Sequence, residues 1–130
     1  MGEIVRKEEF RRNQRSVGMA AEQLAAEYLE KRGMKITDHN FRCKSGEIDL
    51  IGYDCGYLVF VEVKYRSGIG KGAAWEAVGI AKQRQICKVA DFYRMKYRIP
   101  GSTPVRYDVV AIDTDEIVWF RNAFDHQYRV

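Results

Sequence analysis

The sequence predicts a single α/β domain in which a mixed β-sheet carries helices on its faces. A length of 130 residues suits one hydrophobic core. Hydrophobic residues make up 46% and charged residues 31% of the chain, which is typical of a packed globular domain. Helical and strand-like patterns alternate in the order α-β-β-β-α-β-β. We expect residues 1–15 to form a flexible basic arm and residues 16–130 to form the domain.

The first helix is expected to begin near Ser16 and to end near Gly33. Apolar residues recur between them at steps of three and four, which indicates one buried helical stripe. Ser16 is a suitable residue to cap the start of this helix, and Gly33 is a suitable residue to follow its end.

Three strands are expected next, over residues 35–42, 47–53 and 58–65. The third is apolar on both faces, as in a buried central strand. Asp54-Cys55-Gly56-Tyr57 has the character of a tight hairpin turn with a positive φ at Gly56. A glycine-rich stretch, 67–72, is either a plain connection or a loop that covers a phosphate backbone. A helix over 74–97 with a break at Gly79, and strands over 105–112 and 117–124, complete the pattern.

The composition and the N-terminal residues indicate where in the cell the protein is expected. The longest apolar stretch, Tyr57 to Val61, is far shorter than the ~20 residues that span a bilayer, so no membrane association is expected. The first residues have no apolar segment typical of a secretory signal. The three cysteines include no close pair, which argues against a disulfide framework or a zinc site. We therefore expect a cytoplasmic protein.

Acidic residues gather on the predicted hairpin. Strand alternation places Glu47 and Asp49 on one face of their strand, and Glu62 and Lys64 on one face of the next. If the turn is a two-residue loop, paired residue numbers sum to 111, so that Asp49 lies opposite Glu62 and Glu47 opposite Lys64. A three-residue loop would break this register. Opposed Cβ atoms lie ~4.5–5.5 Å apart, so the two carboxylates of Asp49 and Glu62 would be neighbours.

Two carboxylates at about 5 Å repel by roughly 3 kcal/mol at an effective dielectric of 20. A hard divalent cation, Mg²⁺ or Mn²⁺, would neutralise both and leave positions for water and a phosphate oxygen. This ligand set suits phosphodiester hydrolysis, with Lys64 orienting the attacking water or stabilising negative charge. The alternative is a surface ion-pair ladder without chemistry. The apolar character of residues 58–63 argues against that alternative, because such strands are buried.

A third carboxylate comes from the first helix. Glu22 follows Gly18 by one turn and lies at the margin of the apolar stripe, where the small glycine would let a partner approach. An ordinary exposed glutamate is the competing interpretation.

Several motifs together resemble the YraN-like protein family over residues 16–112. They are Gly18-x-x-x-Glu22-x-x-Ala25, Asn40-Phe41-Arg42, Gly46-Glu47-Ile48-Asp49-Leu50-Ile51, Val59-Phe60-Val61-Glu62-Val63-Lys64-Tyr65-Arg66, and Arg106-Tyr107-Asp108-Val109-Val110. The family's motifs are in turn similar to the PD-(D/E)xK nucleases, which have the restriction-endonuclease-like fold, and to archaeal Holliday-junction resolvases. Ile48 stands where the motif's name has proline.

The resemblance implies Asp49 and Glu62 as metal ligands, Lys64 as the catalytic lysine and Glu22 as a further carboxylate that reaches the metal. It implies an Mg²⁺- or Mn²⁺-dependent endonuclease acting on DNA, with branched or junction DNA as a candidate substrate. A homodimer is a candidate assembly, because junction-cutting relatives are dimers.

The placement of charge favours a nucleic-acid partner. The formal net charge is +4, and residues 62–98 carry nine basic and three acidic residues. Candidate nucleic-acid-binding residues in this block are Arg66, Lys71, Lys82, Gln83, Arg84 and Lys88. Two other functions remain open: a nucleic-acid-binding module of the same fold without turnover, and a structural or protein-interaction domain.

Overall fold

The computed structural model describes residues 7–65, 78–113 and 116–127, with side chains from Gly18 onward. Its elements, in chain order, are α1 (Lys7–Lys31), β1 (Lys35–Cys43), β2 (Gly46–Asp54), β3 (Tyr57–Tyr65), α3 (Ile80–Lys96), β4 (Val105–Ile112) and β5 (Ile117–Phe124). The predicted order is confirmed, and β4 and β5 have the predicted bounds. No helix in the described ranges is long and apolar enough to cross a membrane.

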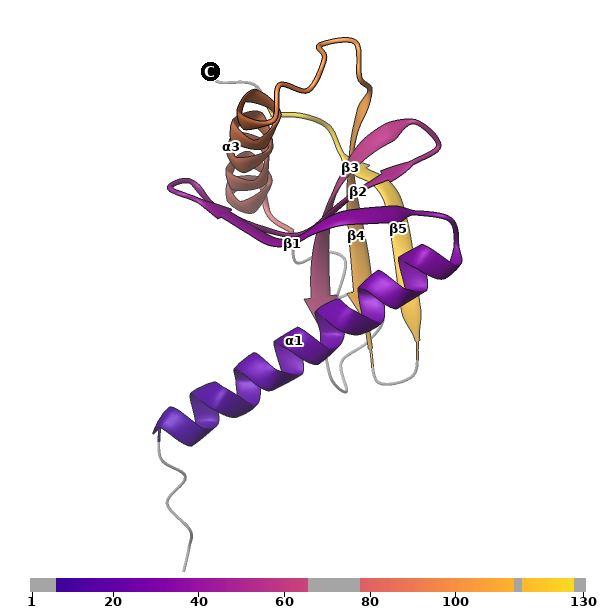
Figure 1. Cartoon of the computed structure of the whole chain (residues 1–130). Helices are drawn as coiled ribbons and strands as arrows, with labels where there is room; N and C mark the ends of the chain where they lie inside the picture. Colours follow the sequence, from indigo (N-terminus) through magenta and orange to yellow (C-terminus); the bar gives the residue numbers. More distant parts are fainter. Residues whose placement is uncertain (1–6, 66–77, 114–115, 128–130) are drawn as a thin grey trace, which may run out of the picture.

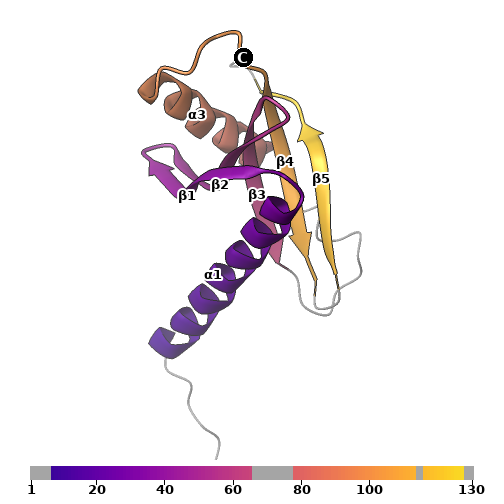
Figure 2. The same cartoon turned by 45° about the vertical axis from the view of Figure 1, so that its right-hand side comes forward.

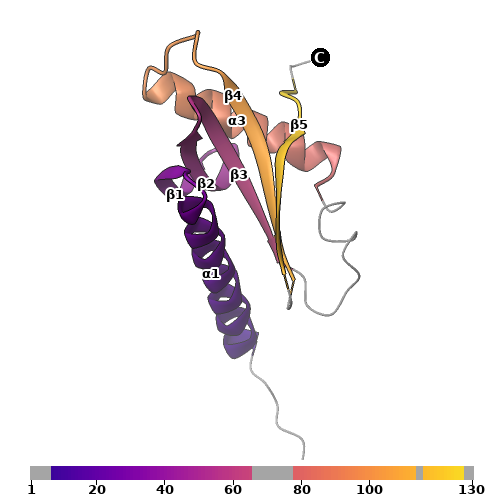
Figure 3. The same cartoon turned by 90° about the vertical axis from the view of Figure 1, so that its right-hand side faces the viewer.

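The strands form one mixed sheet in the order β1-β2-β3-β4-β5, in which only β3 and β4 run parallel. Helix α1 lies on one face of the sheet and α3 on the other (Figures 1 and 3). The predicted α/β class, a mixed sheet flanked by helices, is therefore confirmed.

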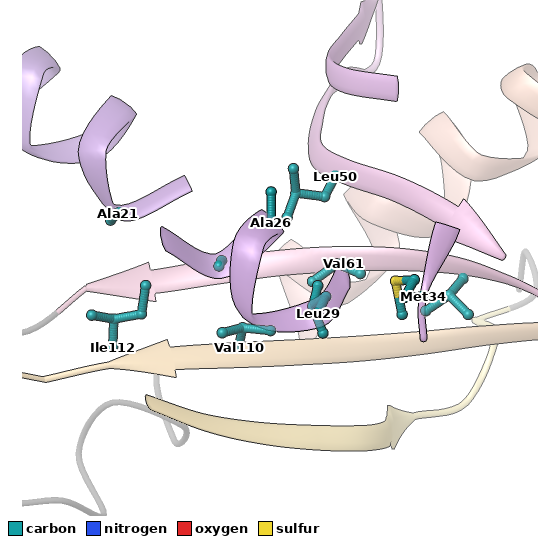
Figure 4. Packing of buried hydrophobic residues seen from close by; sticks show 10 residues of the cluster. Ala21, Ala26, Leu29, Met34, Leu50, Val61, Val110 and Ile112 are labelled. Carbon is teal, nitrogen blue, oxygen red and sulfur yellow. The ribbon is translucent and has the colours of Figure 1, made fainter. Parts of the chain in front are cut away.

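Strand β3 is central and buried on both faces, as predicted. Val59 and Val61 belong to the core between α1 and the sheet, whereas Leu58 and Phe60 belong to the core under α3. Figure 4 shows Val61 among the residues of the first core. The first core also holds Ala21, Ala25, Ala26, Leu29, Met34, Leu50, Val110 and Ile112. The second also holds Ile48, Ile51, Ile86, Cys87, Val89, Ala90, Tyr93 and Tyr107.

The start of α1 differs from the prediction. The helix begins at Lys7, so Ser16 lies inside it and does not cap it. The segment before Ser16 has no apolar stripe but is rich in Lys, Arg, Glu and Gln, which have high helix propensity. The predicted end is confirmed: Gly33 has φ +98°, and the N–H of Met34 donates to the carbonyl of Leu29 at 3.0 Å.

The described part of the second predicted helix begins at the expected break. Gly79 is the N-cap of α3, so the predicted break is the helix start. A glycine costs helix stability, and its extended backbone at φ −73° and ψ 168° ends helical geometry at this point. Residues 66–77, with Arg66, Lys71 and the glycine-rich stretch, lie outside the described residues.

The β2–β3 turn has the predicted two-residue loop. Cys55 and Gly56 have φ +51° and +85°, the signs of a type I′ turn. The ladder runs from Asp54↔Tyr57 to Leu50↔Val61, so paired numbers sum to 111 as predicted. The local turn chemistry thus sets which residues of β2 and β3 meet.

Gly52→Ala is expected to destabilise the protein by about 1–3 kcal/mol. A Cβ at this position would lie 2.5 Å from the carbonyl oxygen of Lys35 on β1. Relieving this clash requires a shift of the paired strand backbone, which costs stability. Urea unfolding measures the loss, with Gly101→Ala as control because a Cβ there meets nothing within 4 Å. Equal stability of the two variants would contradict this account of the β1–β2 contact.

Candidate active site

The candidate site lies where β2 separates from β3. The ladder between them ends at Leu50↔Val61, one position before Asp49 and Glu62. The Asp49 carboxylate instead accepts a hydrogen bond from the backbone N–H of Val63 at 2.8 Å, and the carboxyl groups of Asp49 and Glu62 hydrogen-bond each other. The predicted neighbours are therefore together, through side-chain contact at the end of the ladder rather than as a ladder pair.

Burial makes this pair electrostatically unusual. Asp49 is 8% exposed and Glu62 9% exposed. Burial, followed by the hydrogen bond and the charge of Glu62, raises the pKa of Asp49 to about 8, although the Val63 N–H and the positive charge of Lys82 oppose this rise. Near neutral pH the Asp49 carboxyl group therefore tends to retain its proton.

Lys64 and Glu62 lie on the same face of β3. Val63, between them in sequence, points to the other face and packs on the α1 side. Lys64 is half-buried and lies beside Ala111 of β4. The expected pairing with Glu47 does not form: Glu47 is the ladder partner of Arg42 on β1, and their side chains form an ion pair at 2.9 Å. Past the end of the β2–β3 ladder, β2 pairs only with β1, which takes Glu47 away from β3.

Glu22 approaches the pair from α1. It is half-buried, and both Asn40 of β1 and Asp49 lie close enough to influence its ionisation. Burial raises the pKa of Glu22; the Asn40 hydrogen bond opposes this rise, and the charge of Asp49 adds to it. The predicted third carboxylate thus contacts Asp49, on a helix far from β2 in sequence.

The predicted nucleic-acid-binding residues on α3 fall into two groups. Arg84 and Lys88 are exposed on the helix. Lys82 instead reaches inward, with its Nζ 3.4 Å from Oε2 of Glu62. Gln83 is also engaged within the protein, since its amide donates to the carbonyl of Val78 at 3.1 Å.

Two contacts at the site were not predicted, namely Asn40 to Glu22 and Lys82 to Glu62. Asn40 carries one local signal, because asparagine tolerates the left-handed backbone that it adopts at φ +51°. For Lys82 the sequence offers only its position in the first turn of a helix.

The oxygen ligands fit a hard divalent cation. In the described ranges no three His, Cys, Asp or Glu side chains converge as a metal-binding group. However, Mg²⁺ is usually held by one or two carboxylates and completes its shell with water and substrate phosphate. Asp49 and Glu62 supply such a pair, and a cation bound to both would offset the burial and mutual repulsion that raise the pKa of Asp49.

A groove of about 520 Å³ adjoins the site. It is lined by Arg42, Cys43, Gly46, Glu47, Lys82 and Gln85. The tip of the β1–β2 hairpin lies beside α3 here (Figure 2), close enough that a Cβ on Gly46 would stand 2.6 Å from Nε2 of Gln85. Lys82 lines this groove and also contacts Glu62, so this lysine links the groove to the carboxylate pair.

A second hollow, of about 430 Å³, is lined by Asp91, Arg94, Thr103, Val105, Tyr107, Asn122, Phe124, Asp125 and His126. The Tyr107 hydroxyl lies 2.6 Å from Nδ1 of His126. Burial raises the pKa of both Tyr107 and the neighbouring Cys87 thiol, so neither is an activated nucleophile. The chemistry of the described residues therefore favours the carboxylate site.

Comparison with known proteins places the chain among relatives that lack a described function. The model of the uncharacterised protein family UPF0102 matches residues 21–112. A UPF0102 protein of Lachnoclostridium phytofermentans is 47% identical over 113 residues, which cover 87% of this chain and 96% of the relative. UPF0102 proteins of Legionella pneumophila and Syntrophotalea carbinolica are 43% and 45% identical, over 83% and 85% of this chain and 93% and 92% of theirs.

Proposed function

The chain belongs to the uncharacterised protein family UPF0102, the YraN-like family that its motifs resemble, and we propose that it is a divalent-metal-dependent endonuclease that hydrolyses phosphodiester bonds in DNA. One observation carries the proposal: a buried pair of carboxylates, Asp49 and Glu62, with Lys64 on the same sheet face. Burial and mutual repulsion both oppose ionisation of the two acids, so the pair destabilises the folded protein. Costly buried acids of this kind are concentrated at functional sites.

Asp49 and Glu62 would hold the cation, and Glu22 would accept a hydrogen bond from one of its waters. A bound Mg²⁺ or Mn²⁺ lowers the pKa of a coordinated water and stabilises charge at phosphorus. Lys64, at the end of β3, would orient the attacking water or neutralise the phosphate oxygen that gains charge. The Val63 N–H keeps the Asp49 carboxylate oriented, because it donates to Oδ2.

The surroundings support a nucleic-acid substrate. Arg84 and Lys88 form an exposed basic face on α3, and Arg42 and Lys82 line the groove beside the carboxylates. Cations in such positions bind the phosphate backbone irrespective of base sequence. Branched DNA is the substrate class suggested by the resemblance to junction resolvases.

Lys64→Ala is expected to slow cleavage by about 100-fold or more while Mn²⁺ binding persists, because the lysine acts on the reacting groups rather than on the cation. The assay uses linear, nicked, flapped and four-way DNA with Mg²⁺ or Mn²⁺. Lys35→Ala, an exposed strand lysine on β1, is the matched control. Cleavage by Lys64→Ala at the wild-type rate would point to a contaminating nuclease and overturn the assignment.

The second candidate is a nucleic-acid-binding module without turnover, which the exposed basic face of α3 favours. It predicts binding that weakens with salt, is insensitive to divalent cations, and yields no product at any metal concentration.

A further inference from the structure

We infer that Lys82 is a built-in counterion of the Asp49/Glu62 pair that the divalent cation displaces, so that metal binding releases the lysine into the neighbouring groove. This inference rests on the proposed function, since it concerns the same carboxylates. It assigns Lys82 a positioning role rather than the simple DNA contact that its charge suggests.

The fold directs Lys82 to the site. Gly79 caps α3, and Lys82 lies in the first turn, where α3 faces the end of β3. Its side chain is 33% exposed and Nζ stands 3.4 Å from Oε2 of Glu62. Its charge also acts on Asp49, where it lowers the pKa against the stronger effects of burial and Glu62. One ammonium group therefore serves both acids.

The contact is suited to exchange. Charge-assisted N–H···O bonds are usually 2.7–2.9 Å long, so a separation of 3.4 Å indicates attraction without a tight directional bond. The partner carboxylate is nearly buried while the lysine retains access to solvent on a flexible four-carbon stem. Moving the ammonium group away thus requires rotation of one side chain and no change in the backbone.

A divalent cation on Asp49 and Glu62 would take the oxygens that Lys82 now neutralises. It would also repel the ammonium group, because two positive charges a few ångströms apart interact strongly in a partly buried site. The groove that Lys82 lines is open to the released side chain. A phosphate in that groove would favour the released position, so phosphate and metal would each strengthen binding of the other.

Calorimetric titration with Mn²⁺ tests the displacement without nucleic acid and without turnover. Lys82→Gln should bind Mn²⁺ on the order of tenfold more tightly than wild type, because the cation no longer competes with a bound charge. Lys96→Gln, in the last turn of the same helix, should bind as wild type does. If wild type binds Mn²⁺ and Lys82→Gln binds it equally or more weakly, displacement is wrong while the proposed function stands.

A metal-free measurement tests the counterion role of Lys82 separately from the proposed metal-dependent function. In EDTA, introducing Lys82→Gln should lower the melting temperature of wild type but leave that of an Asp49→Asn/Glu62→Gln double variant unchanged, since the lysine then has neither carboxylate to balance. An equal drop in both backgrounds would overturn the counterion role. Absence of Mn²⁺ binding by wild type would overturn the proposed function, and with it the displacement step.

Discussion

Asp49→Asn is expected to abolish Mn²⁺ binding and cleavage and at the same time to stabilise the metal-free protein. The asparagine carbonyl can accept from the Val63 N–H, and its amide can donate to Glu62, so both hydrogen bonds of Asp49 remain. The charge that burial and Glu62 disfavour is gone. We expect a gain of roughly 1–3 kcal/mol at pH 8, because replacing an unfavourable buried charge is often stabilising.

The size of this gain should depend on pH in a defined direction. The pKa of Asp49 rises from 3.8 to about 8 on folding, so the folded protein holds a proton that the unfolded chain releases. The contribution of Asp49 to wild-type stability is therefore fully present below pH 3.8 and is lost as pH rises towards 8. The advantage of Asp49→Asn over wild type should accordingly be small near pH 4 and largest above pH 8.

Urea unfolding in EDTA across this pH range measures the stability effect, and Mn²⁺ calorimetry on EDTA-free preparations of the same variants measures metal binding. Asp125→Asn, at an exposed position, serves as the control and should alter neither property. A variant that binds Mn²⁺ as wild type does would exclude Asp49 as a metal ligand. A stability difference that does not change with pH would exclude the buried, protonated acid.

Arg106→Met is expected to cost about 3–5 kcal/mol of stability, the range found when one partner of a buried ion pair is removed. Arg106 of β4 binds two acids at once: Nη2 lies 2.8 Å from Oδ2 of Asp54, and Nε lies 2.9 Å from Oδ1 of Asp108. Asp108 is fully buried and also accepts from Trp119 Nε1 at 2.8 Å. Loss of the guanidinium would leave the buried Asp108 carboxylate without its cation and Asp54 with the more distant, exposed Arg121.

Arg121→Met is the matched control. Arg121 on β5 also approaches Asp54, at 3.9 Å, but its side chain is 55% exposed, so its loss should cost less than about 1 kcal/mol. Urea unfolding of both variants measures the contrast. If Arg106→Met were no less stable than Arg121→Met, the network would not hold the β2–β3 turn to β4 as its geometry indicates.

The sequence alone determined the features that depend on neighbouring residues. Gly33 and Gly79 set helix boundaries because each disfavours continued helix. Cys55-Gly56 sets the β2–β3 register because a two-residue turn leaves one pairing, and this register brings Asp49 towards Glu62. The apolar run of β3 marks the central strand for the same local reason. The carboxylate pair was therefore predictable from a single hairpin.

The packing of the helices on the sheet determines which distant residues complete the site. The contacts of Glu22 with Asp49 and of Lys82 with Glu62 depend on how α1 and α3 lie across opposite faces of the sheet. Where the β2–β3 ladder ends, and hence the pairing of Glu47 with Arg42, depends on the path of β2 through the whole sheet. Helix packing angles and ladder ends arise from the sum of many side-chain contacts, so no local pattern specifies them.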